Sequence, residues 1–182
     1  MKMVKPRSRR YVSRDRKKNV VPLSNLRTSE VVKAVVNHPR RLQELANMLD
    51  DRHRGVRDRA AAILARLSES HPGRLNRILE RIKGALLDDS AYVRWHIVYC
   101  LGRIGSSFPM RSSRFLGELS VRLEDDNRIV RRLACQALAR VAVRKPFLVQ
   151  QVFETNKKEM PTALARILQK KAGRKPEKSR LV

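Results

Sequence analysis

Three arginines recur at a fixed interval of 37 residues and could bind phosphate groups. They are Arg66, Arg103 and Arg140. A guanidinium presents its N–H groups in a planar fork that matches the oxygens of phosphates and carboxylates. Near the middle of this row lie three ring-bearing side chains, Trp95, His96 and Tyr99. They could stack on a nucleobase. Because Trp95 and Tyr99 are four residues apart, they could equally pack against each other on one helix.

Catalytic chemistry has little support in the sequence. His96 has no carboxylate three or four residues away, and no HExxH motif, glycine-rich phosphate loop or Ser/His/Asp set joined by spacing occurs. The two cysteines, Cys100 and Cys135, cannot form a four-ligand zinc site and are interpreted as core residues. We therefore expect a protein that is not an enzyme and that needs neither a metal nor a cofactor.

The charge of the chain favours a polyanionic partner. Its 182 residues include 42 Lys and Arg against 17 Asp and Glu, which gives a formal net charge of +25. Residues 1–22 and 170–182 are strongly basic and lack apolar periodicity, which predicts two basic tails around a domain at 23–169. Aromatic residues are only 4% of the chain, too few for a protein that stacks many unpaired bases. The candidate contacts in the tails are Arg7, Arg9, Arg10, Arg14, Arg16, Lys17, Lys18, Lys170, Lys171, Arg174 and Lys175.

The sequence between the tails repeats itself with the same period of 37 residues. The triplet Leu42, Leu45 and Leu49 recurs twice, and so do Val56-Arg57 and Pro72. A fixed period of about 20–50 residues indicates a solenoid. The spacing of the leucines predicts one helix per repeat, followed by an acidic turn and a second helix that starts near the valine and ends before the proline. Helices at 28–37, 147–157 and 162–171 are expected to form shorter terminal repeats.

The stretch LLDDSAYVRWHIVYCLGRIG, residues 86–105, resembles HEAT repeats. The similarity is clear over about residues 40–145 and looser over 24–170. It implies an all-α fold, a right-handed α-solenoid of antiparallel helix pairs with about three clear repeats, worn terminal repeats and basic tails. It also implies a polar ladder along the stack, in which each arginine is at least half buried and paired with one of the aspartates. The ladder residues are Asp51, Arg57, Asp88, Arg94, Asp125 and Arg131.

The second helices line the concave side in HEAT-like stacks. At 100° per residue, Arg59 and Arg66 lie on the side of their helix opposite Arg57. Equivalent positions bring to that side Trp95, His96, Tyr99, Arg103, Arg132 and Arg140. The first helices carry a second row, which is diluted by glutamates, so the concave face is not the only basic one. That row is Arg40, Arg77 and Arg114.

These observations favour a non-enzymatic nucleic-acid-binding protein that contacts the phosphate backbone of DNA or RNA with low sequence specificity. The alternative is a scaffold for acidic protein partners. The third hypothesis is an alkylpurine DNA glycosylase built of HEAT-like repeats, with Trp95 in the groove and Asp58 as the only acid there. No small-molecule substrate is predicted. The chain has no long apolar run for a membrane and no secretory signal, so we expect an intracellular protein of the cytoplasm, nucleoid or nucleus.

Overall fold

The computed structural model describes residues 22–157 and 159–172, and this part of the chain contains helices and no strand. None of the helices in these two ranges is long and apolar enough to cross a membrane. Several of the predicted tail contacts lie outside the described residues, namely Arg7, Arg9, Arg10, Arg14, Arg16, Lys17, Lys18, Arg174 and Lys175.

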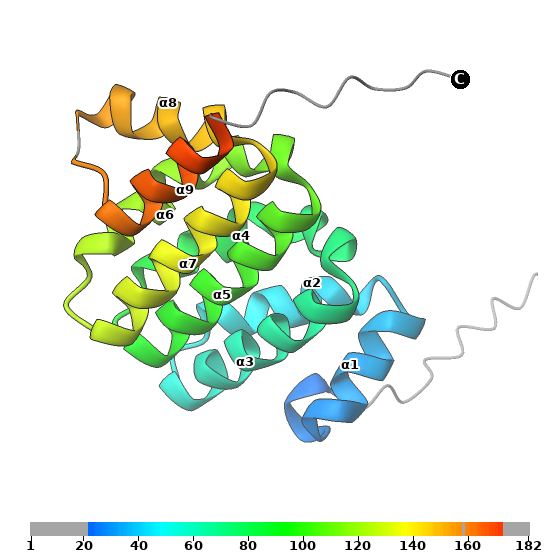
Figure 1. Cartoon of the computed structure of the whole chain (residues 1–182). Helices are drawn as coiled ribbons and strands as arrows, with labels where there is room; N and C mark the ends of the chain where they lie inside the picture. Colours follow the sequence, from blue (N-terminus) through cyan, green and yellow to red (C-terminus); the bar gives the residue numbers. More distant parts are fainter. Residues whose placement is uncertain (1–21, 158, 173–182) are drawn as a thin grey trace, which may run out of the picture.

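Antiparallel helix pairs stack side by side in two layers (Figure 1). One layer, the long-helix layer, consists of α3 (Arg54–Ser70), α5 (Ala91–Ser107) and α7 (Arg128–Arg144). The other, the short-helix layer, contains α2 (Arg41–Asn47), α4 (Leu79–Gly84) and α6 (Leu116–Val121). At the ends lie η1 (Leu23–Asn25) with α1 (Thr28–Asn37), and α8 (Pro146–Asn156) with α9 (Thr162–Ala172). The predicted all-α solenoid is confirmed.

Prolines and small polar residues set the helix boundaries. Three helices begin with a proline: η3 (Pro72–Ile78), η5 (Pro109–Arg114) and α8, which begins at Pro146. The backbone N–H that proline lacks would have no partner within the helix at this first position. The side chains of Ser90 and Asn127 accept backbone N–H groups at the starts of α5 and α7.

The last helix ends one residue beyond the predicted range of 162–171. α9 continues to Ala172, so Lys170 and Lys171 belong to its last turn and not to a separate tail.

The first helix of each repeat is shorter and more broken than predicted. In the second repeat η3, α4 and η4 (Ala85–Leu87) follow one another, with a break at Ile78, where φ is −119° and ψ 19°. The third repeat, with η5, α6 and η6 (Arg122–Glu124), breaks at Phe115, where φ is −142° and ψ 0°. Both residues are buried. Burying such a side chain stabilises the fold by about 1.5–3 kcal/mol. The interruption of the helix costs about 1 kcal/mol for a lost hydrogen bond, so burial outweighs it.

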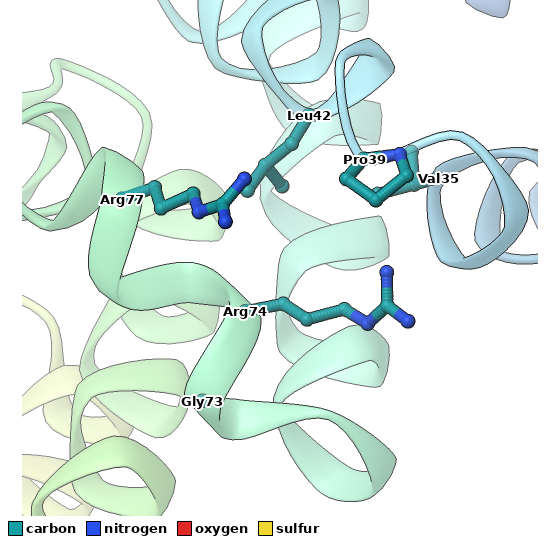
Figure 2. A pocket seen from close by; sticks show the side chains of 6 residues that line it. All are labelled: Val35, Pro39, Leu42, Gly73, Arg74 and Arg77. Atoms are coloured by element: carbon teal, nitrogen blue, oxygen red, sulfur yellow. The ribbon is translucent and has the colours of Figure 1, made fainter.

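The core lies between the two layers. The repeated leucine positions of the short helices face the long helices, and all are buried except Leu123, which is half-buried. In the first repeat η2 (Met48–Asp50) completes the short helix. Where α1 joins α2, a hollow of about 340 Å³ opens between these helices and η3, lined by Val35, Pro39, Leu42, Gly73, Arg74 and Arg77 (Figure 2).

Two glycines allow α5 and α7 to approach closely. A Cβ atom added at Gly102 would lie 2.8 Å from the Cβ of Ala137, and one added at Gly105 would lie 2.7 Å from a methyl group of Val141. Atoms do not approach so closely without movement of the backbone. The two helices therefore require glycine at these positions, although glycine by itself weakens a helix.

Gly102→Ala should destabilise the protein although alanine is the better helix former. We expect the free energy of unfolding to fall by about 1–3 kcal/mol, because the new methyl group overpacks the α5–α7 contact. Gly55→Ala is the matched control: Gly55 is also helical, and apart from its own helix backbone and chain neighbours no atom lies within 4 Å of the position that its Cβ would occupy. This control should gain about 0.5–1 kcal/mol. Denaturant unfolding followed by circular dichroism measures both, and equal stability of the two variants would contradict the close approach.

Candidate nucleic-acid interface

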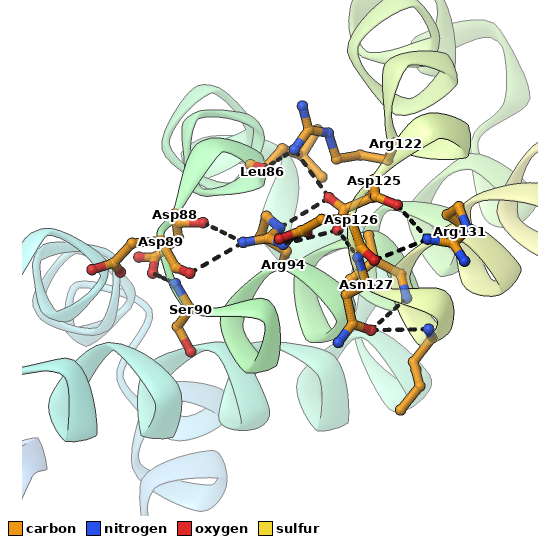
Figure 3. A network of polar contacts seen from close by, with 12 residues as sticks. Leu86, Asp88, Asp89, Ser90, Arg94, Arg122, Asp125, Asp126, Asn127 and Arg131 are labelled. Carbon is orange, nitrogen blue, oxygen red and sulfur yellow. Dashed lines mark hydrogen bonds and ion pairs between the residues drawn. The ribbon is translucent and has the colours of Figure 1, made fainter.

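A ladder of buried arginine–aspartate pairs runs across the repeats on one edge of the long-helix layer (Figure 3). Arg94 on α5 donates from Nε and Nη2 to the two carboxylate oxygens of Asp125, at 2.9 and 2.8 Å. Arg57 on α3 binds Asp88 in the same way, at 2.8 and 3.3 Å. The second carboxylates of the turns, Asp89 and Asp126, also accept from these guanidiniums.

Each arginine therefore crosses to the aspartate of the next repeat. The aspartate of its own repeat contributes a backbone carbonyl: Arg57 Nη1 donates to the oxygen of Asp51 at 3.1 Å, and Arg94 Nη1 to that of Asp88 at 3.0 Å. Each arginine thus bridges two turns. Such bidentate, charge-assisted bonds are the strong class of hydrogen bond and fix the register of neighbouring repeats.

The last arginine of the ladder differs from the prediction. Arg131 is exposed, and it donates to the carbonyl oxygens of Asp125 and Asp126 at 2.7 and 2.9 Å. Among the described residues no carboxylate pairs with it. The repeat period is lost at this point: α3, α5 and α7 begin 37 residues apart, whereas α9 begins 34 residues after α7.

The ladder controls the ionisation of Asp125. Burial opposes the charged form of this side chain, which is only 1% exposed, but hydrogen bonds from Arg94 and the Asn127 amide outweigh burial and lower its pKa to about 2. The pKa of Arg94 is raised, chiefly by its hydrogen bonds to Asp125. Both groups are therefore charged at neutral pH.

The predicted arginine row lies on the long-helix layer, away from the ladder. Arg66 and Arg140 are exposed, and Arg103 is half-buried with its Nη2 3.4 Å from the carbonyl oxygen of Glu69. The guanidinium of Arg140 lies 6.0 Å above the ring centre of Tyr99. Two further predicted contacts belong to the same helices: Arg59 on α3 is half-buried, and Arg132 on α7 is exposed. We call Arg66, Arg103 and Arg140 the arginine row.

A hollow beside the row brings the predicted ring residues together. It measures about 330 Å³ and is lined by Thr28, Ala62, Ala65, Arg66, Glu69, Trp95, His96 and Tyr99. The sequence prediction missed Glu69. The carboxylate of Glu69 accepts a hydrogen bond from the Tyr99 hydroxyl at 3.0 Å. The same helical geometry that selected Arg66 places Glu69 one turn further along α3, so this signal was present in the sequence.

His96 is less suited to contact phosphate than the sequence suggests. The side chain is buried, its Nδ1 lies 2.9 Å from the carbonyl oxygen of Tyr92, and its ring stacks on Trp95 at 3.6 Å between centres. Burial lowers its pKa, so the neutral ring dominates at neutral pH. His96 therefore supports one face of Trp95.

The acid predicted for a glycosylase is engaged in structural bonds. Asp58 accepts a hydrogen bond from the Ser90 hydroxyl at 2.7 Å and pairs with Arg54 at 3.5 Å. The described residues contain no group of three or more potential metal ligands. Burial raises the pKa of the Cys100 thiol to about 12, so it is not a nucleophile at neutral pH.

Ion pairs between repeats neutralise much of the short-helix layer. Arg81 binds Asp50 at 2.8 Å, and Lys83 binds Glu118 at 3.1 Å. In the second predicted row, Arg114 donates to Glu80 at 2.6 Å, whereas Arg40 and Arg77 are exposed. This layer therefore carries cations and carboxylates in alternation.

Comparison with known proteins identifies the repeat and the fold. A family model described as HEAT repeats matches residues 42–139. A designed armadillo repeat protein in complex with the peptide (KR)4 is similar, with 15% identity and a TM-score of 0.58 over 79% of this chain and 74% of that chain. One engineered protein has 18% identity and a TM-score of 0.55, over 77% of this chain and 64% of that chain. Another engineered protein has 18% identity and a TM-score of 0.58, over 85% of this chain and 38% of that chain. No curated protein sequence matches the chain.

Arg94→Ala should lower the free energy of unfolding by about 1–4 kcal/mol, because it leaves the buried carboxylate of Asp125 without its main partner. Arg131→Ala removes the same residue type at the equivalent position of the next repeat, where no described carboxylate faces it, and should change stability by no more than about 0.5 kcal/mol. Chemical denaturation of both variants gives the comparison. Equal losses would show that the carboxylate partner contributes nothing.

The ladder also predicts an acid dependence. Since the folded-state pKa of Asp125 is about 2 against an ordinary 3.8, its contribution of about 2 kcal/mol is present above pH 4 and is lost as the pH falls towards 2. The stability difference between the wild type and Asp125→Asn should therefore shrink over this range. Asp51→Asn is the control, because the Asp51 carboxylate accepts from the His53 amide and from no arginine that the structure describes. A difference for Asp125→Asn that stays constant with pH would contradict the pairing.

Proposed function

The chain belongs to the HEAT repeat family, and from that premise we propose that it is a non-enzymatic nucleic-acid-binding protein whose long-helix layer contacts the phosphate backbone. DNA and RNA are both candidate ligands. The arginine row supplies the central contacts, with Arg59 and Arg132 beside it. The basic residues of the predicted tails, most of which lie outside the described part of the chain, would add further contacts.

The observation that carries the proposal is the distribution of charge between the layers. Helices α3, α5 and α7 hold eleven arginines and two carboxylates, and α5 and α7 have no Asp or Glu at all. The ladder uses carboxylates of the turns, and Glu80 and Glu118 lie in the short-helix layer, where they pair with Arg114 and Lys83. Eight arginines of this layer are not part of the ladder, and no repeated acid accompanies the row.

The spacing of the row suits a polyanion. Packed helices lie about 8–10 Å apart, so the three arginines extend over about 20 Å. Duplex DNA rises about 3.4 Å per base pair and presents two phosphates at each step, so this distance corresponds to about six base pairs. Arginines on such a row bind the backbone without reading base edges, which favours low sequence specificity.

The hollow beside Trp95 adds a place for one base at most. His96 covers one face of the Trp95 ring, and Tyr92 meets it edge-on at 5.3 Å between centres. The hollow is lined by both Arg66 and Glu69, and the carboxylate of Glu69 repels phosphate there. We therefore assign the affinity to the arginines and a minor role to the rings.

Protein partners are the alternative. The designed armadillo protein is in complex with a lysine–arginine peptide, so a protein of similar fold binds a peptide. A peptide of that charge would be repelled by the long-helix layer of this chain, so a protein ligand of this layer would have to be acidic. Nucleic acid meets the same requirement with a regular array of charges.

Replacing all three arginines of the row with alanine should weaken binding to a labelled mixed-sequence duplex by about ten- to a hundredfold at about 50 mM salt. The negative slope of log affinity against log salt should become less steep by about 2–3, because three phosphate contacts are lost. Fluorescence anisotropy over a range of salt concentrations measures both. A matching single-stranded RNA shows which nucleic acid is preferred.

The control is the equivalent triple variant of the short-helix layer, Arg40→Ala with Arg77→Ala and Arg114→Ala. It removes the same charge from residues that precede the row by 26 positions. Its salt slope should stay near that of the wild type, and both variants should melt near the wild-type temperature because exposed charges contribute little to folding. Equal weakening by both triples, or no binding at low salt, would overturn the proposal and favour an acidic protein partner.

A further inference from the structure

We propose that the hollow between α1, α2 and η3 binds a short acidic peptide segment through Arg74 and Arg77. This hollow belongs to the short-helix layer and is separate from the surface proposed for nucleic acid. Figure 2 shows both guanidiniums extending towards its apolar wall, which Pro39, Leu42 and Val35 form. The inference does not depend on the nucleic-acid proposal.

The two arginines extend in the same direction from one helix (Figure 2). η3 is a 3₁₀ helix from Pro72 to Ile78, and side chains three residues apart eclipse one another in such a helix. Two like charges in this position repel each other unless an anion lies between them. No hydrogen bond or ion pair joins the guanidinium of Arg74 or Arg77 to another described residue.

The next repeat shows how the same pair is neutralised. Its equivalents are Arg111 and Arg114 in η5. Arg114 donates to the carboxylate of Glu80 at 2.6 Å, and Arg111 lies 5.4 Å above the ring of Phe108. A carboxylate and an apolar surface thus satisfy this pair within the chain.

Both partners are replaced in the repeat that contains the hollow. The position 37 residues before Glu80 is Gln43, and the position before Phe108 is His71. Gln43 lines the same surface depression as Arg77, so the side chain that could have supplied a carboxylate is in place but uncharged. Gly73, which stands where the next repeat has Met110, also lines the hollow.

The missing groups define the ligand. The next repeat uses a carboxylate for Arg114, so the geometry of this position suits a Glu or Asp side chain. The wall of Pro39, Leu42 and Val35 suits an aliphatic neighbour of that acid. A segment in which acidic residues flank leucine, isoleucine or valine meets both requirements, and the hollow of about 340 Å³ has room for one such side chain with its carboxylate.

The test uses a fluorescein-labelled synthetic peptide of repeated Glu-Glu-Leu triplets and measures its binding by fluorescence anisotropy. The double variant Arg74→Gln with Arg77→Gln should bind at least about tenfold more weakly than the wild type. The register-matched double variant Arg111→Gln with Arg114→Gln loses the same charge and should bind within about threefold of the wild type. A Glu-Glu-Ser peptide of equal charge should bind more weakly than the leucine peptide.

Gln43→Glu gives an independent test that removes no contact. It restores to Arg77 the carboxylate that Glu80 provides to Arg114, so the ligand must compete with it and the peptide should bind at least about threefold more weakly. Circular dichroism checks that each variant folds. Equal loss in both double variants, equal binding of the serine peptide, or an unchanged affinity for Gln43→Glu would each overturn the proposal. Duplex binding, measured in parallel, should be the same for the wild type and Arg74→Gln with Arg77→Gln, which keeps the two proposals separate.

Discussion

The bidentate bond between a buried arginine and the aspartate of the next repeat is the interaction on which this structure depends. Burial of charge is unfavourable unless every hydrogen-bonding group is satisfied, and Arg94 meets this condition with two aspartate side chains and two backbone carbonyls. The bond holds adjacent turns together. It also uses the acidic side chains of the repeats at the edge of the stack, which leaves the arginine row without a carboxylate partner among the described residues. The same bonds therefore hold the register of the solenoid and leave the surface of the long-helix layer positively charged.

The two layers handle charge in different ways. In the short-helix layer the cations meet carboxylates of neighbouring repeats, as Arg81 does with Asp50 and Lys83 with Glu118. These pairs are exposed and add little to stability, but they keep the local charge balanced. In the long-helix layer, α5 and α7 contain no Asp or Glu that could balance the charge of their arginines. The contrast separates a surface suited to a long polyanion from one on which only isolated positions, such as Arg74 and Arg77, lack a partner.

Much of the fold follows from the period of 37 residues, because repeated leucines, valines and prolines mark the same helix boundaries in each unit. The sequence also identifies the ladder residues, but not their partners: whether Arg57 binds Asp51 or Asp88 depends on how the repeats stack, and both choices have the same local sequence. The burial of His96 and the exposure of Arg131 were missed for a related reason. Each depends on the packing of neighbouring elements. After α7 the period of 37 residues is lost, because α9 begins 34 residues after α7, and Arg131 bonds only to backbone carbonyls among the described residues.

The ladder has a direction, since Arg57 and Arg94 each bind the aspartate of the repeat that follows. Duplication of a whole repeat adds one arginine and one aspartate in matching positions, so a longer stack arises by gene duplication without an unpaired buried charge. Loss of a whole repeat preserves the matching equally. Insertion of half a repeat would leave a buried carboxylate opposite an apolar side chain. The bonds that hold the solenoid together therefore also confine changes in its length during evolution to whole units.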